Sequence, residues 1–483
     1  MAAGAGWMIG MRLCVTSLGF VSTLMLARLL APADFGLVAL ATALVAALEL
    51  LTSFRFDVAL IQNQSASRED YDSAWTLNLL LAGGLAILLL ILAVPAAALF
   101  DDPRLSSIIC ALALSSIMDG AQNIGIVNFR KDLTFGKEFT FVTIRKISSV
   151  VVGVTTAWMF RSYWALAAGI LTSSAVGLAA SFVMHTYRPR PCLAATRRLL
   201  AFSKWLIADN LIQFLRTRAS DLLIGKLAGA GSLGLFNLAQ ETATLAQSTV
   251  TAPINRALLP AYARLQDDLD SLRKIYLATI GITTLIAVPM AVGIAAVAPL
   301  FVPILLGDHW LESIPLIEVL GFASAVSMCG SGAPVIYVAL GRPRLGVLLG
   351  IVDISILLSG IGILLPRHGP IGAAWAALIA ALVILPLRLS LARWVLGAVL
   401  RGWIGAVWRP IVSAAAMYAV VAVFSAQPDP SAGALMQIPG LAGSVALGMS
   451  AYIGTTAMLW RLAGGPLGAE QTIAASVRRL FFR

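Results

Sequence analysis

LFNLAQETATLAQSTVTAPINRALLP, the stretch from Leu235 to Pro260, is long and apolar enough to cross a bilayer as one helix. Polar residues nevertheless recur within it at steps of three and four positions. These residues are Asn237, Gln240, Glu241, Thr244, Gln247, Ser248, Thr251 and Asn255. Because each residue turns an ideal helix by about 100°, they share roughly a third of its circumference. Lipid cannot solvate such a stripe, so we expect it to face protein or a water-filled cavity.

The composition of the whole chain is typical of a membrane protein with many spans. Of 483 residues, 59% are hydrophobic and only 12% are charged, and the mean hydropathy is +0.90. Soluble domains hold about twice that charged fraction. We therefore predict an all-α polytopic membrane protein with about fourteen transmembrane helices, or about twelve if two segments are merged or interfacial.

The net charge of +11 arises from basic residues in short loops between apolar segments. This distribution is typical of cytoplasmic loops and not of a nucleic-acid groove, so we expect no nucleic-acid partner. The intervening loops, such as 31–34 and 101–103, are short and poor in basic residues. By the positive-inside rule, both termini are expected in the cytoplasm.

An internal repeat predicts two lobes. ARLLAPADFGLVALA (Ala27–Ala41) aligns without gaps with GKLAGAGSLGLFNLA (Gly225–Ala239), and the same offset places Glu49 on Gln247. Two similar six-helix lobes in the same orientation are a recurring transporter plan, with the substrate between them. The expected parts are an N-terminal six-helix lobe (1–187), a basic cytoplasmic linker (188–204), a C-terminal six-helix lobe (205–396), two additional transmembrane helices (397–465) and a cytoplasmic amphipathic tail (466–483).

Polar and charged residues within the predicted helices define a candidate site around a central cavity. The candidate substrate-binding residues are Arg12, Arg55, Arg216, Arg256, Asn210, Gln213, Gln240, Thr244 and Gln247. Arginine suits a phosphate ligand, because its guanidinium binds phosphate oxygens in pairs and stays charged. Glu241, Glu49 and Asp353 are candidates for coupling transport to Na⁺ or H⁺. Each also has a structural alternative, since a charged side chain can extend to headgroups or neutralise a neighbour on its helix.

The sequence lacks the motifs of several kinds of catalytic chemistry. It contains no GxxxxGK[ST], HExxH or GxSxG motif, so we predict no P-loop ATP hydrolysis, no catalytic residues and no enzymatic activity. Its three histidines are far apart, and its four cysteines share no metal or disulfide spacing, so we expect no metal site and no cofactor besides a coupling ion.

Five segments resemble, in the same order, those of the Wzx-type polysaccharide flippases, which share a superfamily with the lipid II flippase MurJ and the MATE multidrug exporters. They are LARLLAPADFGLVALA (Leu26–Ala41), NFRKDLTFGKEF (Asn128–Phe139), LLIGKLAGAGSLGLFNLAQE (Leu222–Glu241), LPAYARLQDDLDSLRKIY (Leu259–Tyr276) and LLGDHWLESIPLIEVLG (Leu305–Gly321).

The resemblance implies two helix bundles around a cationic cavity and alternating access. By this mechanism, an undecaprenyl-pyrophosphate-linked oligosaccharide would cross the bacterial inner membrane for O-antigen, capsule or exopolysaccharide export. It also implies functional arginines on the first, second and eighth helices, for which Arg12, Arg55 and Arg256 are the candidates. We expect a monomer that contacts membrane lipids, with the polysaccharide polymerase and export machinery as candidate partners.

Two alternatives stay open. A MATE-like cation-coupled drug antiporter should line its cavity with acids and aromatic residues in place of arginines. A membrane-bound polymerase or ligase should carry a large outer loop with catalytic residues. The longest expected outer loop, Gln427–Pro439, contains only one acid, Asp429.

Overall fold

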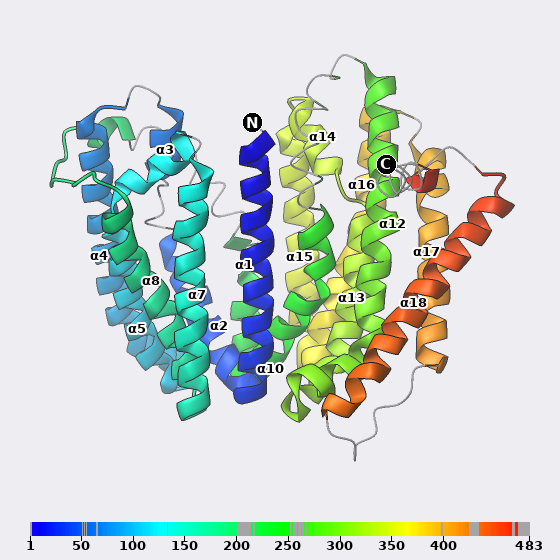
Figure 1. Ribbon diagram of the computed structural model, residues 1–483, viewed down its shortest axis with the longest axis horizontal. Coiled ribbons are helices and arrows are strands. Elements are labelled where there is room, and N and C mark those ends of the chain that lie inside the picture. Colours follow the sequence, from blue (N-terminus) through cyan, green and yellow to red (C-terminus); the bar gives the residue numbers. More distant parts are fainter. Residues whose placement is uncertain are drawn as a thin grey trace. The chain divides into compact units, whose positions relative to one another are not determined.

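The structure of the protein is a computed structural model, in which every regular element of the described residues is a helix (Figure 1). The structure describes residues 2–50, 52, 54, 56–63, 66–132, 134–199, 214–215, 218–251, 254, 258, 262, 265, 268–397, 399–424, 434–465 and 469–471. Within them, 11 helices are long and apolar enough to cross a membrane, or up to 12 if one bent pair forms a single span. The prediction of an all-α polytopic membrane protein is confirmed.

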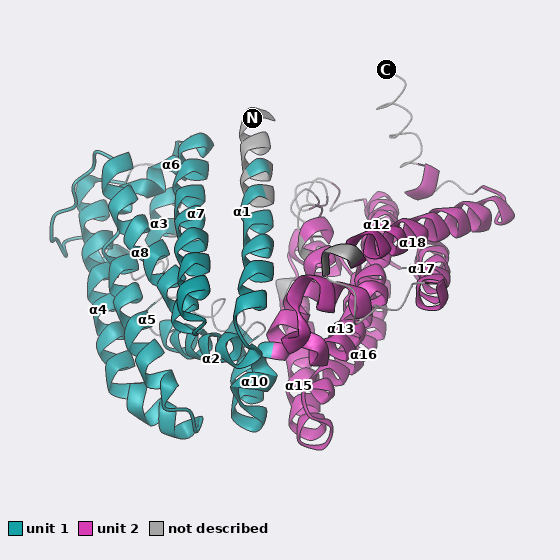
Figure 2. Ribbon diagram, turned by 60° about the horizontal axis from the view of Figure 1, so that its bottom comes forward, with its two compact units in different colours: residues 1–234 teal, residues 235–483 magenta. Residues whose placement is uncertain are grey.

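The chain forms two compact units, unit 1 (residues 1–234) and unit 2 (residues 235–483) (Figure 2). The boundary between them falls inside α10 (Ala219–Ala243), where the backbone is already interrupted at Gly229, with φ 77°. This interruption lies at the tight turn, Gly229–Ser232, that is expected between the seventh helix (205–229) and the eighth (233–260). The first part of that seventh helix, residues 205–213, lies outside the described residues. The lobe boundary at 188–204 therefore stays a prediction.

Unit 1 is a bundle in which α7 packs against α1 and α8, and α5 packs against α2, α4 and α8. Besides the start of α10, its elements are α1 (Ala2–Leu29), α2 (Pro32–Glu49), α3 (Phe56–Gln62), α4 (Arg68–Leu99), α5 (Arg104–Gly120), the 3₁₀ turn η1 (Ile124–Val127), α6 (Asn128–Lys131), α7 (Phe135–Phe160) and α8 (Trp164–Met184).

Equivalent glycines of the two repeat copies meet within unit 1, where α2 crosses the first part of α10. A Cβ atom added to Gly36 would lie 1.6 Å from the carbonyl oxygen of Ala230, and one added to Gly234 would lie 1.8 Å from that of Pro32. Gly36 and Gly234 occupy equivalent positions in the repeat. Only glycine allows two helix backbones to approach this closely, which explains why both copies keep it.

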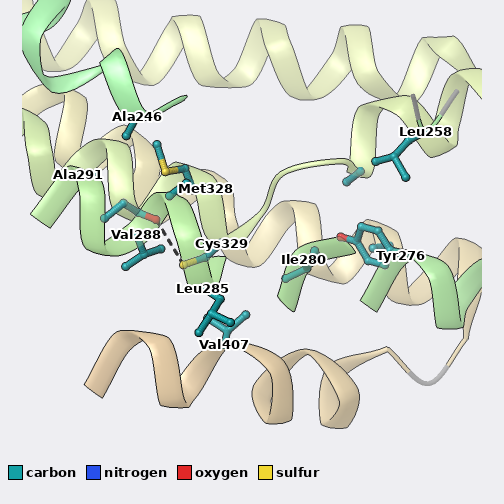
Figure 3. Close-up of a cluster of buried hydrophobic side chains, with 14 of the residues drawn as sticks. Ala246, Leu258, Tyr276, Ile280, Leu285, Val288, Ala291, Met328, Cys329 and Val407 are labelled. Atoms are coloured by element: carbon teal, nitrogen blue, oxygen red, sulfur yellow. Dashed lines mark hydrogen bonds between the residues drawn. The ribbon is translucent and has the colours of Figure 1, made fainter. Parts of the chain in front are cut away.

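Unit 2 is built around the long helix α12, which packs against α13 and α17. Its elements are η2 (Gln247–Thr251), α12 (Leu269–Phe301), η3 (Val302–Leu306), η4 (Asp308–Ser313), α13 (Ile314–Cys329), α14 (Ala333–Ala339), α15 (Pro343–His368), α16 (Pro370–Leu396), α17 (Leu400–Phe424) and α18 (Ala434–Leu462). Its core joins Ile280 and Val288 of α12, Met328 of α13 and Val407 of α17 (Figure 3).

A short C-terminal piece packs into unit 2. Ala469 lies against α12, where a Cβ atom on Gly281 would meet the Ala469 methyl group at 3.3 Å. Beside it, Glu470 Oε1 lies 3.2 Å from Nε of Arg409 on α17, and both side chains are buried. This part of the expected amphipathic tail therefore contacts the helix bundle.

Helix irregularities occur at corresponding places in the two halves of the sequence. α2 ends at Glu49, and the next described helix, α3, begins at Phe56. The repeat-equivalent segment Gln247–Thr251 is a π-helix. The fourth helix expected in each half is also interrupted. The first of these, expected at 105–127, bends after Gly120 of α5, and the second, expected at 314–340, is broken at Gly332, with φ 82°, between α13 and α14. Paired discontinuities of this kind are typical of transporter binding sites, because they leave backbone polar groups for water or ligand.

The polar stripe that predicted a cavity lies on the less buried side of its helix. Gln240 and Thr244 are half-buried and Glu241 and Gln247 are exposed, whereas Leu238, Ala239, Thr242, Ala243 and Ala246 are buried. Thr251 departs from the stripe and is only 7% exposed. It departs because the π-helix turns less per residue than the ideal helix on which the stripe was drawn.

Candidate functional site

The candidate site is a polar cavity of about 580 Å³ inside unit 1. α2, α3, α4 and α5 supply most of its walls. Three carboxylates, Glu49, Asp57 and Asp119, and one guanidinium, Arg218, line it among its described residues. The other lining residues are Thr42, Val45, Ala46, Thr52, Phe54, Phe56, Asn78, Leu81, Ala82, Leu85, Leu112, Ser115, Ser116, Gly120 and Ile170.

The break in the second span positions Glu49. Glu49 is the last residue of α2, and its carbonyl oxygen accepts a hydrogen bond of 3.0 Å from the amide of Thr52. The helix therefore ends where its last carbonyls and the Glu49 carboxylate can be solvated by the cavity. Asp119 and Arg218 are the charged groups that act on this carboxylate. The structure thus places Glu49 in a cavity, while its coupling role stays a prediction.

Asp119 is a cavity residue that the sequence analysis missed. It lies in the last turn of α5 and accepts hydrogen bonds from Ser174 Oγ at 2.8 Å and Gln122 Nε2 at 2.5 Å. Its Oδ1 also lies 3.2 Å from Nη2 of Arg145 on α7. The polar run SSIMDGAQN at 115–123, which ends a predicted span, could have revealed it.

The NFRKDLTFGKEF segment (Asn128–Phe139), which follows the bend after α5, forms polar contacts beside the cavity. Arg130 contacts both Glu138, at 2.6 Å, and the cavity-lining Asp57, at 3.8 Å. Asn128 Oδ1 accepts a hydrogen bond of 2.6 Å from the Tyr71 hydroxyl on α4. The conspicuous polar residues of this segment therefore connect α3, α4 and α7 at the Asp57 end of the cavity.

The remaining coupling candidates lie in unit 2. Asp353 on α15 forms an ion pair of 3.4 Å with Arg388 on α16, a partner that the sequence analysis did not anticipate. Glu241 is exposed on the second part of α10. Asp353 therefore has a counter-charge within its own unit.

Most of the candidate substrate-binding residues fall outside the part of the chain that the structure describes. These are Arg55, Asn210, Gln213, Arg216 and Arg256. Arg12 is on α1, and its side chain is likewise outside the description. The expected cationic character of the cavity therefore stays a prediction, since the described lining has three acids and one arginine.

Unit 2 contains an apolar groove of about 440 Å³ between α12, α17 and α18. Its lining consists of Pro289, Met290, Gly293, Ile294, Val297, Met417, Val421, Ser444, Val445, Gly448, Met449, Tyr452 and Ile453. The Tyr452 hydroxyl donates to the Leu285 carbonyl at 2.8 Å and so presents no free donor to the groove. The two helices beyond the predicted repeat thus form most of an apolar surface that suits a hydrocarbon chain.

Within the described residues, no group of three His, Cys, Asp or Glu side chains is placed so that it could hold a metal ion.

Comparison with known proteins gives the cavity and the groove a context. Residues 25–315 match the model of a family described as "Polysaccharide biosynthesis protein". The chain is 26% identical over 419 residues to the lipopolysaccharide biosynthesis protein WzxC of Escherichia coli, covering 84% of each chain. It is 24% identical over 330 residues to the succinoglycan biosynthesis transport protein ExoT of Rhizobium meliloti, covering 66% of this chain and 65% of that one.

Two solved structures share the fold. The inward closed conformation of the lipid II flippase MurJ matches with a TM-score of 0.68 at 12% identity, over 95% of this chain and 99% of that one. An inward-facing MATE multidrug transporter of the MOP superfamily matches with a TM-score of 0.58 at 14% identity, over 79% of this chain and 95% of that one. At these identities the likeness concerns the fold alone.

Proposed function

This chain belongs to the polysaccharide biosynthesis protein family, and we propose that it is a flippase for a lipid-linked oligosaccharide. The substrate class is an undecaprenyl-pyrophosphate-linked glycan that crosses the bacterial inner membrane by alternating access, for O-antigen, capsule or exopolysaccharide export. The polysaccharide polymerase and export machinery are its proposed partners. The transport involves no covalent chemistry, and both chain termini are proposed to be cytoplasmic.

The observation that carries the proposal is the polar cavity within a bundle of membrane-spanning helices. A glycan presents many hydroxyl groups, and removing them from water without hydrogen-bonding partners costs several kcal/mol. Ser115, Ser116, Asn78 and Thr42 supply such partners from three different helices of the cavity. The names of WzxC and ExoT, which place those relatives in polysaccharide production, support the same substrate class.

The apolar groove supports a lipid carrier. A polyprenyl chain gains no hydrogen bonds and requires contact with flexible apolar side chains, which Met290, Met417 and Met449 supply. We propose that the chain lies along α12, α17 and α18, and that Arg12, Arg55, Arg216 and Arg256 bind the pyrophosphate.

Transport is proposed to be coupled to Na⁺ or H⁺ at Glu49, with Asp119 as a second carboxylate in the same cavity. Asp119 is paired with Arg145, and Arg218 with Asp221, so Glu49 is the cavity acid without an ion-pair partner among the described residues and is the better site for a cation or a proton. Asp353 is the weaker candidate, because Arg388 already neutralises it.

A reconstitution assay tests the proposal. Purified protein in liposomes should move a fluorescent polyprenyl-pyrophosphate-linked glycan between leaflets, and an imposed ion gradient should accelerate it. A Glu49→Gln variant should bind the glycan but lose the response to the gradient. Active, correctly folded protein that moves no glycan of the host's own type would refute the flippase assignment.

A MATE-like cation-coupled antiporter is the second candidate, because the described cavity also has the acids and aromatics expected of one. Phe54 and Phe56 stack in parallel beside it, with ring centroids 5.8 Å apart. Deletion of the gene distinguishes the two functions. Loss of a flippase should accumulate lipid-linked glycan, whereas loss of an antiporter should change the sensitivity of the cell to cationic drugs.

A further inference from the structure

The segment that follows α8 is fastened to unit 1 instead of running free. Residues 187–198, here called the strap, include nearly all of the described part of the expected linker, 188–199, and lie beside the first turns of α4 (Figure 1). Ala195 belongs to one hydrophobic cluster with Tyr71, Ala74 and Leu77 of α4. Ala195 therefore anchors the strap to the packed interior of this unit, while the other strap residues are half-buried or exposed.

Buried polar side chains of α4 bind the backbone of the strap. Asp72 Oδ1 accepts hydrogen bonds from the Arg190 amide at 2.8 Å and from the Tyr187 hydroxyl at 2.6 Å. The Cys192 amide donates to Thr76 Oγ1 at 2.9 Å, and the Ala195 amide donates to Ser73 Oγ at 3.1 Å. Asp72 and Ser73 are 6% and 0% exposed.

These bonds require an ordered strap. A buried carboxylate or hydroxyl left without its donors is strongly disfavoured, so undocking the strap has to be offset by water or by new partners. Arg198 pairs with the buried Asp70 at the far end, which adds a second charged anchor. The strap thus has a docked state defined by a small number of identifiable bonds.

Asn123 connects the strap to the cavity. It lies in the break after α5, is fully buried, and uses its amide and both polar atoms of its side chain. Its amide donates to Ser181 Oγ at 2.9 Å, its Oδ1 accepts from the Gly125 amide at 2.9 Å, and its Nδ2 donates to the Tyr187 carbonyl at 2.6 Å. The neighbouring Gln122 donates to the cavity carboxylate Asp119. One helix break therefore contacts the cavity on one side and the strap on the other.

We propose that the strap is a latch whose docking on α4 is coupled, through the break at Gln122 and Asn123, to the state of Asp119 in the cavity. A cation or proton on Asp119 changes its bonds to Gln122, Ser174 and Arg145, shifts the break, and weakens the grip of Asn123 on Tyr187. The biological meaning of this coupling rests on the proposed transport function, but the coupling itself can be measured in protein that transports nothing.

Cys192 provides a native probe of the latch, because its backbone amide is one of the docked groups. In a full-length C14A/C110A/C329A protein, maleimide labelling of Cys192 should be slow, and Asp72→Asn should accelerate it by about tenfold or more, as expected for a lost hydrogen bond to a charged group. Thr76→Val, which removes the Cys192 acceptor together with the bond of the same hydroxyl to the Asp72 carbonyl within α4, serves if the Asp72 variant does not fold. Unchanged labelling in a folded variant would overturn the docked strap.

Asp119→Asn tests the coupling, with Asp102→Asn as the matched control, since Asp102 pairs with Arg104 elsewhere in unit 1. We expect labelling of Cys192 to increase several-fold in Asp119→Asn alone. In protein that also carries Asn123→Ala, Asp119→Asn should no longer change the labelling rate. Equal rates for Asp119→Asn and the control would overturn the coupling, whether or not the protein proves to be a flippase.

Discussion

The polar cavity of unit 1 and the apolar groove of unit 2 have similar sizes but are built differently. The cavity lies where helices stop, with Glu49 at the end of α2 and Asp119 just before the break after α5. The groove lies along α12, α17 and α18, which continue as helices beside it, and glycines such as Gly293 and Gly448 provide its space. Pro289 of α12 leaves the Leu285 carbonyl without its helical donor, and the Tyr452 hydroxyl binds that carbonyl. Helix ends bring backbone polar groups that need solvation, whereas intact helices present only their side chains.

Glu49, an exposed acid that lines the cavity of unit 1, also differs from two charged residues of unit 2 in having no ion-pair partner among the described residues. In unit 2, Arg409 and Asp353 have partners at 3.2 and 3.4 Å, in Glu470 and Arg388. In the described part of unit 1, Glu49 faces the cavity without an ion pair closer than 4 Å. A paired charge stabilises a structure, while an unpaired one in a hydrated cavity is available to a ligand.

The largest expected effect follows from unpairing a charge in unit 2. Glu470→Ala leaves the Arg409 guanidinium, whose side chain is 6% exposed, without its partner and should destabilise the protein by about 3–5 kcal/mol. Thermal unfolding of the purified protein measures this. Asp270→Ala breaks an exposed pair with Arg273 and should change stability by less than about 1 kcal/mol. Equal unfolding temperatures for the two variants would contradict the buried pair.

The next effect concerns the unpaired acid of unit 1. Glu49→Gln removes a charge without changing the size of the side chain and should lower ion-driven transport by about tenfold or more, because an amide neither binds a proton nor attracts a cation. Initial rates in proteoliposomes with and without an ion gradient measure it. Glu312→Gln, on the exposed surface of η4, is the control. A variant that keeps full gradient dependence would remove Glu49 from the coupling.

Filling the groove should have a smaller and more selective effect. A Cβ atom on Gly293 would meet Met417 Cε at 3.6 Å, so Gly293→Leu fits only by occupying the groove. We expect the transport rate of a long-chain polyprenyl glycan to fall several-fold, and that of a short-chain analogue to change less. Gly350→Leu on α15, where a Cβ would meet nothing within 4 Å, is the control. The same loss for both chain lengths would argue against a lipid path.

The smallest effect is a pH response confined to the polar unit. His185 Nδ1 accepts a hydrogen bond of 3.1 Å from the Tyr187 amide, and burial, with the nearby Lys137 and Arg188 opposed by Asp132, lowers the pKa of His185. Because the folded pKa lies below the ordinary value of about 6.5, strap docking is fully stable above that pH and weakens as pH falls below it.

Hydrogen exchange of the strap amides measures this response. Protection relative to the unfolded chain should fall a few-fold between pH 7 and pH 5, and His185→Gln should flatten the profile, while amides of α12 should show no such change. A strap whose protection is independent of pH would show that His185 does not contribute to docking.

Much of the fold was evident from the sequence, because the bilayer imposes it. Length and apolarity predict spans at about 75–100 and 276–303 without any knowledge of packing, where the structure has the longer helices α4 (Arg68–Leu99) and α12 (Leu269–Phe301). The glycines at 36 and 234 revealed the repeat because close helix crossings admit no other residue. Glu49 was found because an acid within an apolar segment is conspicuous.

The tertiary structure alone decided which polar groups meet. Asp119 ends an ordinary helix, and only the folding of α7 and α8 around it brings Arg145 and Ser174 to its carboxylate. Arg388 was not among the sequence candidates, and only the packing of α15 against α16 brings it to Asp353. The sequence predicted the strap as a linker, because every residue has the same backbone amide and the sequence does not show which amides are bound. In the structure, the amides of the strap donate to Asp72, Ser73 and Thr76. Periodicity within one helix is local and can be predicted, whereas hydrogen bonds between residues more than a hundred positions apart exist only after folding.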